Sequence, residues 1–290
     1  MSLSLRPLND SGFGAVIDCN LATDAADLAP QLARALHQHR LLIVPGQHLN
    51  HADLRTAASC FGEVDTRTDR RYAVGGFPGL TAISNIAEDG EHVGVYDGDN
   101  EEEWHADNSF KPQLTRATLL YSVITPEKGG ETRFADTTRA YADLPEQMKQ
   151  RINELRSVHS IEQLGALQSQ ASGGRSSAAS GSLAGHPEVE HPLVLQHPTT
   201  GARSLLLGSM VICGITGLTE EDSSGLLADL LQHATSPPYV YSHRWNQGDL
   251  VIWDNLATLH TASPCNSSRH SRLLYRAAVR QPAASSGSVR

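Results

Sequence analysis

The sequence predicts an α+β fold in which short strands form a sandwich or jelly roll and helices flank it. Short runs with strand character recur along the chain, with turn residues between them. Other segments carry apolar residues at helical spacing. A chain of 290 residues with 39% hydrophobic and 19% charged residues can bury the core of one globular domain. We therefore expect a single domain over residues 1–280.

Four segments have the apolar periodicity of amphipathic helices. In the first, leucines recur at four-residue steps and Pro30 is expected near the start, where proline is tolerated. In the last, Thr219 and Asp222 form a variant capping pair. The apolar stripes are expected to face the core and to have no functional role. The expected helices cover 24–39, a segment from Asn50 to near Gly62, 144–156 and 219–233.

Strands are expected where β-branched and aromatic residues lie between turn signals. The expected strands cover 41–44, 116–124, 192–196, 203–209, 239–245, 249–254 and 271–279. Segment 163–187 is poor in apolar residues, so it is either a lid or a disordered insertion, and both alternatives stay open. The tail 281–290 is expected to fray.

Charge and hydropathy exclude several classes of partner. A net charge of −9 argues against nucleic acid as a general partner. No apolar run approaches the roughly 18 residues of a membrane span, so no membrane partner is expected. The four cysteines are scattered and indicate free thiols in a reducing compartment. Without a signal-peptide pattern at the N-terminus, the expected location is the cytoplasm.

The most informative motif is Trp104-His105-Ala106-Asp107. On a strand, residues two apart share a face, so His105 and Asp107 would present an imidazole and a carboxylate side by side. A later histidine, His260, could complete a set of two histidines and one carboxylate. Such a set holds Fe(II) and leaves coordination positions open. Since the chain has 14 histidines, a His-x-Asp pair by itself would be weak evidence.

Two arginines follow His260. If 271–279 is a strand, Arg272 and Arg276 share one face of it. A guanidinium binds a carboxylate through two hydrogen bonds, so the pair suits anion capture. Exposed arginines on an edge strand are the alternative.

Together these features resemble the taurine dioxygenase and 2,4-dichlorophenoxyacetate dioxygenase (TauD/TfdA) family of Fe(II)/2-oxoglutarate enzymes. The order and spacing of the motifs carry the resemblance, which runs over almost the whole chain. The matching segments are 41–47, 104–110, 129–136, 243–255, His260 and the two arginines.

The resemblance implies a double-stranded β-helix (jelly-roll) core and the cofactors Fe(II), 2-oxoglutarate and O2. It matches His105, Asp107 and His260 to the iron ligands. Thr132 and Arg272 match the residues that bind the distal carboxylate of 2-oxoglutarate. Arg276 matches a position that binds 2-oxoglutarate in some members and substrate in others. The implied reaction hydroxylates a small anionic substrate, such as an aryloxyalkanoate, carboxylate or alkylsulfonate, and releases succinate and CO2.

Substrate contacts are less well defined. Members usually have asparagine four residues before the first ligand histidine, where this chain has Glu101. A carboxylate there would repel an anion or favour a substrate that carries an amine. The resemblance also makes Asn108, Arg67 and Arg70 candidate substrate residues.

Two other functions use the same features. One is a sensor that binds metal and 2-oxoglutarate without turnover, and the other is a zinc hydrolase. Relatives often form dimers or tetramers, so a homo-oligomer is an implied partner.

Overall fold

The computed structural model describes residues 3–67, 72–88, 91–96, 102–162 and 187–280. Within them the largest sheet has nine strands, in the order β1-β2-β3-β17-β9-β19-β5-β8, with β4 also paired to β19. The strands are β1 (Ser4–Pro7), β2 (Ala15–Asp18), β3 (Leu41–Val44), β17 (Leu250–Asp254), β9 (Thr115–Ile124), β19 (Leu273–Arg280), β5 (Leu80–Ser84), β8 (Val95–Tyr96) and β4 (Glu63–Val64).

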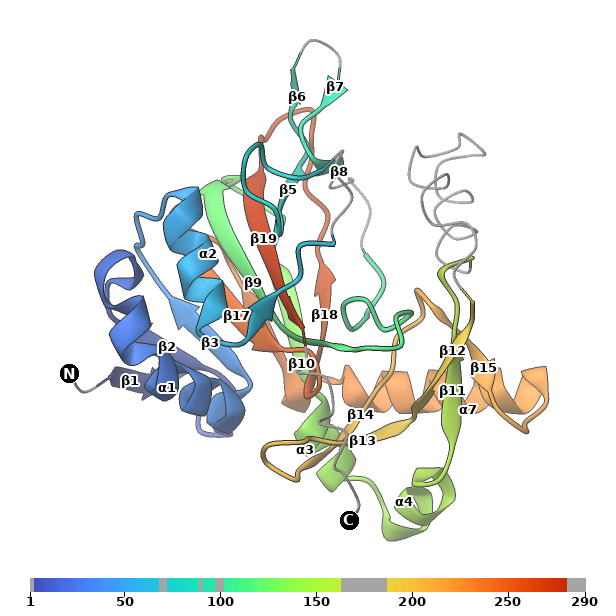
Figure 1. Cartoon of the computed structure of the whole chain (residues 1–290). Helices are drawn as coiled ribbons and strands as arrows, with labels where there is room; N and C mark the ends of the chain where they lie inside the picture. The colour runs from blue at the N-terminus through green and yellow to red at the C-terminus, as the bar shows by residue number, and fades with distance from the viewer. Residues whose placement is uncertain (1–2, 68–71, 89–90, 97–101, 163–186, 281–290) are drawn as a thin grey trace, which may run out of the picture.

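Helices α1 (Leu21–His39) and α2 (His51–Ser59) cover one face of this sheet (Figure 1). Side chains alternate along a strand, so each central strand contributes to two cores. On β17, Leu250 and Ile252 pack in the cluster beneath α1 and α2. Val251 and Trp253 point the other way, into a second cluster. The large sheet is therefore buried on both faces near its centre.

A three-stranded sheet lies against that second face. It has the order β16-β10-β18, built from β16 (Val240–His243), β10 (Thr132–Asp136) and β18 (Thr258–Ala262). Phe134 of β10 and Leu274 of β19 pack in the cluster between the two sheets. Side chains of β19 and β10 that lie on the same strand face as Leu274 and Phe134 therefore point into the space between the two sheets.

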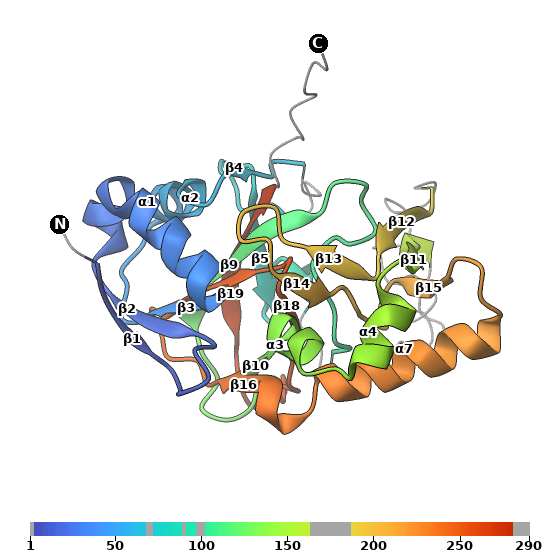
Figure 2. The same ribbon diagram turned by 90° about the horizontal axis from the view of Figure 1, so that it is seen from below.

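The remaining elements form a third packed region, seen most clearly from below (Figure 2). Its strands are β11 (Arg156–His159), β12 (Val189–Pro192), β15 (Ile212–Ile215), β13 (Val194–Gln196) and β14 (Arg203–Leu205). Its helices are α3 (Thr137–Ala142), α4 (Glu146–Ile152), α7 (Glu220–Ala234) and the 3-10 helix η1 (Pro237–Tyr239). The hairpin of β6 (Ala87–Glu88) and β7 (Glu91–His92) stands apart from it. No helix in the described part of the chain is long and apolar enough to cross a membrane.

The α+β class is confirmed, with several differences in the elements. The first helix starts at Leu21, because Asn20 caps it by accepting from the Ala22 amide, so Pro30 lies inside the helix and not near its start. The third starts only at Glu146, after the N-cap residue Pro145, which lacks helical backbone angles (φ −56°, ψ 144°). The expected strand 192–196 is two strands separated at Leu193. The insertion 163–187, apart from its last residue, and the tail 281–290 lie outside the described residues.

Candidate metal centre

The structure brings His105, Asp107 and His260 together. One ligand atom from each lies within 4.8 Å of the others. His260 lies on β18, and His105 pairs with it through two backbone hydrogen bonds of 3.0 and 2.9 Å. This pairing joins parts of the chain that are 155 residues apart.

The prediction that His105 and Asp107 lie on a strand was wrong. His105 forms an isolated bridge, and the chain then turns at Asp107, where Asn108 follows with a left-handed backbone (φ 55°). The Asn108 side chain donates to the Thr115 hydroxyl at 3.0 Å. Asparagine tolerates this conformation better than most residues, which explains how the turn forms. The turn, and not strand alternation, directs the Asp107 carboxylate toward the imidazoles.

Both imidazoles are oriented for metal binding. The Nδ1 atom of His105 lies 2.8 Å from the Glu103 carbonyl oxygen, so it carries the hydrogen and leaves the Nε2 lone pair available. The His260 ring packs beside Trp253, with ring centroids 4.7 Å apart. Burial, and then the nearby His105, lowers the pKa of His260 to about 3. His260 is therefore neutral at pH 7, as a metal ligand must be.

The carboxylate of Asp107 is buried between two partners. It accepts from the Thr118 hydroxyl at 2.6 Å through Oδ2 and from Arg276 Nη1 at 3.3 Å through Oδ1. Burial by itself would raise the pKa of Asp107, but the charges of His260, Arg276 and His105 and the Thr118 hydrogen bond lower it to about 2. The group is ionised at neutral pH. Two imidazoles and one anionic carboxylate form a donor set that fits a divalent metal ion.

A hydrogen-bonded network behind Asp107 was not predicted from the sequence. The side-chain oxygen of Asn255 accepts from the Asp107 amide at 3.2 Å and from Trp253 Nε1 at 3.1 Å. The Asn255 amide group donates to the Thr118 hydroxyl at 2.8 Å. Asn255 thus fixes the backbone of Asp107 and, through Thr118, its carboxylate. The motif around Asn255 carried the resemblance, but no feature of the sequence pointed to Thr118.

Thr132 lies on the strand paired with the one that carries His260, and Arg272 lies close to Gly130, two residues before Thr132. On β10, Thr132 pairs with Ala262 and Phe134 pairs with His260. Thr132 is two residues from Phe134, so the two side chains are on the same face of the strand. Its hydroxyl accepts from Trp245 Nε1 at 3.0 Å. Arg272 is only 1% exposed and packs against Gly130, where an added Cβ would lie 3.4 Å from its Cδ. Arg272 precedes β19 instead of belonging to it, and a bulge separates Leu273 from Leu274.

The other expected site residues are placed differently. Arg276 contacts Asp107 directly. Arg67 pairs with Asp65, at 3.0 Å, and its side chain is 59% exposed. Asn108 is engaged in the turn described above. Glu101 and Arg70 lie outside the described residues.

A second group of potential ligands consists of His37, His197 and Asp254. The Nδ1 atom of His197 accepts from the amides of Thr199 and Thr200, at 3.2 and 3.1 Å. Its Nε2 atom therefore carries the hydrogen and donates to Asp254 at 3.0 Å. A metal at this nitrogen would require loss of that hydrogen, so we interpret this group as a hydrogen-bonded support for the end of β17.

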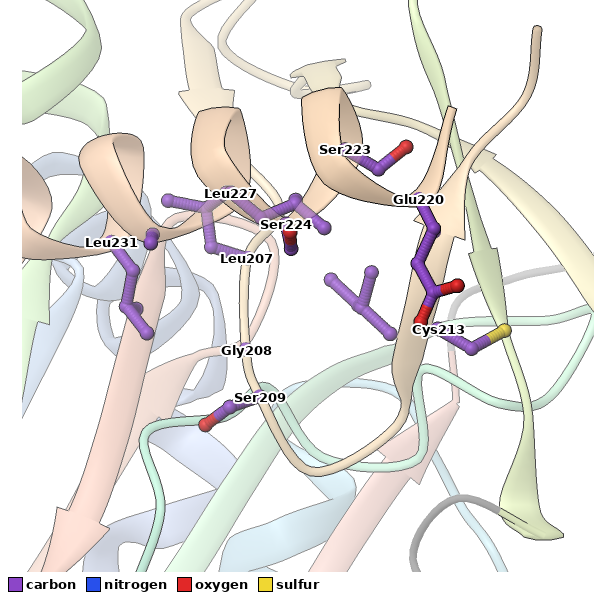
Figure 3. A pocket seen from close by; sticks show the side chains of 12 residues that line it. Leu207, Gly208, Ser209, Cys213, Glu220, Ser223, Ser224, Leu227 and Leu231 are labelled. Carbon is purple, nitrogen blue, oxygen red and sulfur yellow. The ribbon is translucent and has the colours of Figure 1, made fainter. Parts of the chain in front are cut away.

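A cavity of about 420 Å³ is lined by residues Leu207, Gly208 and Ser209, which precede β15 (Figure 3). Ser209 on that segment donates its amide to the Trp104 carbonyl oxygen at 3.2 Å. Leu227 and Leu231 of α7 and Cys213 of β15 also line the cavity. Gly208 lies close to the ligand segment, since an added Cβ would be 3.0 Å from the Trp104 carbonyl oxygen and 3.1 Å from the His105 Cα. None of the metal-cluster residues lines this cavity.

The fold and the site define a class of metal-dependent enzyme, and the comparisons identify its family. Residues 4–278 match the family described as "Taurine catabolism dioxygenase TauD, TfdA family". The chain is 32% identical to the (S)-phenoxypropionate/alpha-ketoglutarate-dioxygenase of Sphingobium herbicidovorans, over 94% of this chain and 95% of that protein. It is 33% identical to the alpha-ketoglutarate-dependent 2,4-dichlorophenoxyacetate dioxygenase of Burkholderia sp., over 83% of each.

A solved structure agrees with these relatives. The crystal structure of AAD-2 in complex with Mn(II) and N-oxalylglycine has a TM-score of 0.80 and 26% sequence identity to this chain, and it covers 98% of this chain and 99% of its own. The chain belongs to the TauD/TfdA family of alpha-ketoglutarate-dependent dioxygenases. It is an enzyme that uses alpha-ketoglutarate, also called 2-oxoglutarate, as co-substrate and a metal bound by a His/Asp triad.

Proposed function

We propose that the resident metal is Fe(II) and that His105, Asp107 and His260 hold it. The support is the convergence of two imidazoles and one ionised carboxylate within 4.8 Å. This donor set is typical of non-haem Fe(II) oxygenases. When bound, Fe(II) with 2-oxoglutarate supplies the oxidation of a substrate C–H bond by O2, with succinate and CO2 as co-products.

Thr132 and Arg272 anchor the distal carboxylate of 2-oxoglutarate. A hydroxyl and a guanidinium can bind the two oxygens of one carboxylate together. Burial lowers the pKa of Arg272 to about 10, which still leaves the guanidinium charged at neutral pH. Arg272 is buried and packs against Gly130, which limits the positions that its side chain can take.

The substrate is a small anionic molecule that is hydroxylated, and cleaved where the attacked carbon bears an oxygen or sulfonate. Arg276 supports this proposal, because its guanidinium contacts the metal ligand Asp107 and its side chain is 31% exposed. The relatives that act on phenoxypropionate and 2,4-dichlorophenoxyacetate are consistent with an acidic substrate.

The core is a double-stranded β-helix, and residues 1–280 are one domain. The two facing sheets with the site between them support the first proposal. A cytoplasmic location and a homo-oligomeric assembly remain predictions from the sequence.

The test is succinate release by protein loaded anaerobically with Fe(II) and 2-oxoglutarate and then exposed to O2. We expect release that requires both additions, that disappears in Asp107→Ala, and that needs a higher 2-oxoglutarate concentration in Thr132→Val. A protein that binds Fe(II) and 2-oxoglutarate but releases no succinate with any member of a panel of carboxylates, sulfonates and amino acids would be a sensor. Hydrolytic activity with Zn(II) and without 2-oxoglutarate would indicate a hydrolase.

A further inference from the structure

The three metal-ligand residues, His105, Asp107 and His260, have one partly exposed cationic side chain and one exposed anionic side chain beside them. Arg276 Nη1 lies 3.3 Å from Asp107 Oδ1. Glu102 Oε1 lies 3.9 Å from His105 Nε2. The two side chains are 31% and 40% exposed, so part of each is accessible to a small molecule.

The position of Glu102 is built into the fold. Its amide donates to the Ala262 carbonyl oxygen at 3.0 Å, and its own carbonyl oxygen accepts from the Thr261 hydroxyl. Both partners lie on β18, the strand that carries His260. The backbone of Glu102 is therefore held on the same scaffold as the ligand, and its carboxylate is not on a free loop.

The surroundings of Glu102 favour a positively charged group or a hydrogen-bond donor. His105 Nε2 presents a lone pair, because its Nδ1 hydrogen is used by Glu103. Within the described part of the chain, the Glu102 carboxylate accepts no hydrogen bond. Two acceptors 3.9 Å apart repel each other, and because the Glu102 side chain is 40% exposed, either water or a positively charged group of a ligand can lie beside it.

The bound metal satisfies His105 but does not by itself satisfy Glu102. The ligand atoms that gather within 4.8 Å come from His105, Asp107 and His260, and Glu102 is not among them. Its carboxylate therefore borders the metal site on the side of His105. Because Glu102 and Asp107 are both acidic, this side of the site disfavours an anionic substrate group and favours a cationic one.

We propose that the enzyme prefers a zwitterionic substrate, with an anionic group beside Arg276 and a protonated amine beside Glu102. This inference rests on the proposed function, because it assigns the substrate of the same site. It narrows the substrate from small anions in general to amino acids and related amino carboxylates. It also makes Glu102 a specificity-determining residue.

The test uses pairs of compounds that differ only in the amine: phenylalanine with hydrocinnamate, leucine with isocaproate, and β-alanine with propionate. Binding is measured by anaerobic calorimetry on Co(II) protein with 2-oxoglutarate, and succinate release is measured on Fe(II) protein. In at least one pair, the amine-bearing member should bind about tenfold tighter, the effect expected for one charged hydrogen bond.

Substitutions at Glu102 and at its neighbour isolate the contribution of the Glu102 carboxylate. Glu102→Gln should reduce the preference for the amine about tenfold while leaving Co(II) and 2-oxoglutarate affinities unchanged. Glu102→Lys should reverse the preference. Glu103→Gln is the matched control: it removes the same charge one residue along, where the carboxylate accepts from Ser209 at 2.6 Å, and the preference should remain.

Three outcomes would overturn the inference. The first is tighter or equal binding of the member without the amine in every pair. The second is an unchanged preference in Glu102→Gln. The third is loss of Co(II) affinity in Glu102→Gln, which would make Glu102 a metal ligand. These differ from failure of the proposed function, in which the parent protein neither binds nor consumes 2-oxoglutarate.

Discussion

Replacing Thr118 by valine tests whether the network behind Asp107 positions the metal ligand. Valine has nearly the shape of threonine, so the change removes a hydroxyl without leaving a large cavity. That hydroxyl donates to Asp107 at 2.6 Å and accepts from Asn255 at 2.8 Å. Thr118 is fully buried, so water cannot replace either bond.

The expected effects follow from the two lost bonds. An unpaired buried polar group costs about 1–3 kcal/mol, and two groups lose a partner, so the free energy of unfolding of Thr118→Val should fall by about 2–6 kcal/mol. Loss of a partner that orients a metal ligand should weaken metal binding about 10- to 100-fold. The Thr118 bond also helps to lower the pKa of Asp107, so protons should compete with the metal at a higher pH in the variant.

The assay is anaerobic Mn(II) titration, with urea unfolding of the same samples. Thr118→Ser is the control, because it keeps the hydroxyl and loses only a methyl group, at a cost of about 1 kcal/mol. It should bind Mn(II) like the parent. Equal Mn(II) affinity in parent and valine variant, or equal loss in both variants, would refute a positioning role for Thr118.

Three further predictions concern other parts of the molecule. Gly208→Ala should weaken Mn(II) binding, because its Cβ would lie 3.1 Å from the backbone of His105. The control is Gly225→Ala in α7, whose added Cβ meets nothing within 4 Å. It should raise the free energy of unfolding by about 0.5–1 kcal/mol. Arg272→Leu should abolish measurable 2-oxoglutarate binding in calorimetry but leave Mn(II) binding intact, and unchanged 2-oxoglutarate affinity would remove Arg272 from the anchor. Burial, and then His191, lowers the pKa of His159 from 6.5 to about 3, so the unfolded chain binds one more proton between these values. The unfolding free energy should therefore fall by about 1.4 kcal/mol per pH unit from this group as pH drops below 6.5, and urea melts of His159→Gln should lack that part of the slope.

Much of the fold could be predicted because the signals were local. The helix that ends at His39 and the strand Leu41–Val44 follow from apolar spacing and turn residues. Boundaries were less accurate where one residue decides them. Asn20 extends α1 by capping it, and Pro145 delays the start of α4.

The site depended on contacts that sequence spacing does not encode. A strand would have placed His105 and Asp107 on one face, but the chain makes a bridge and a turn there. The partners of Asp107 are Thr118 on β9 and Arg276 on β19, strands that adjoin in the sheet but are far apart in the sequence. Only the pairing of these strands brings the hydroxyl and the guanidinium to one carboxylate.

The most direct test of the metal centre is the number of Mn(II) ions bound per chain, measured by electron paramagnetic resonance under anaerobic conditions. We predict one ion for the parent protein, none for Asp107→Ala, and one for His197→Gln, which alters the second histidine–aspartate group. Retention of the ion in Asp107→Ala, or its loss in His197→Gln, would contradict the assignment of the metal to His105, Asp107 and His260.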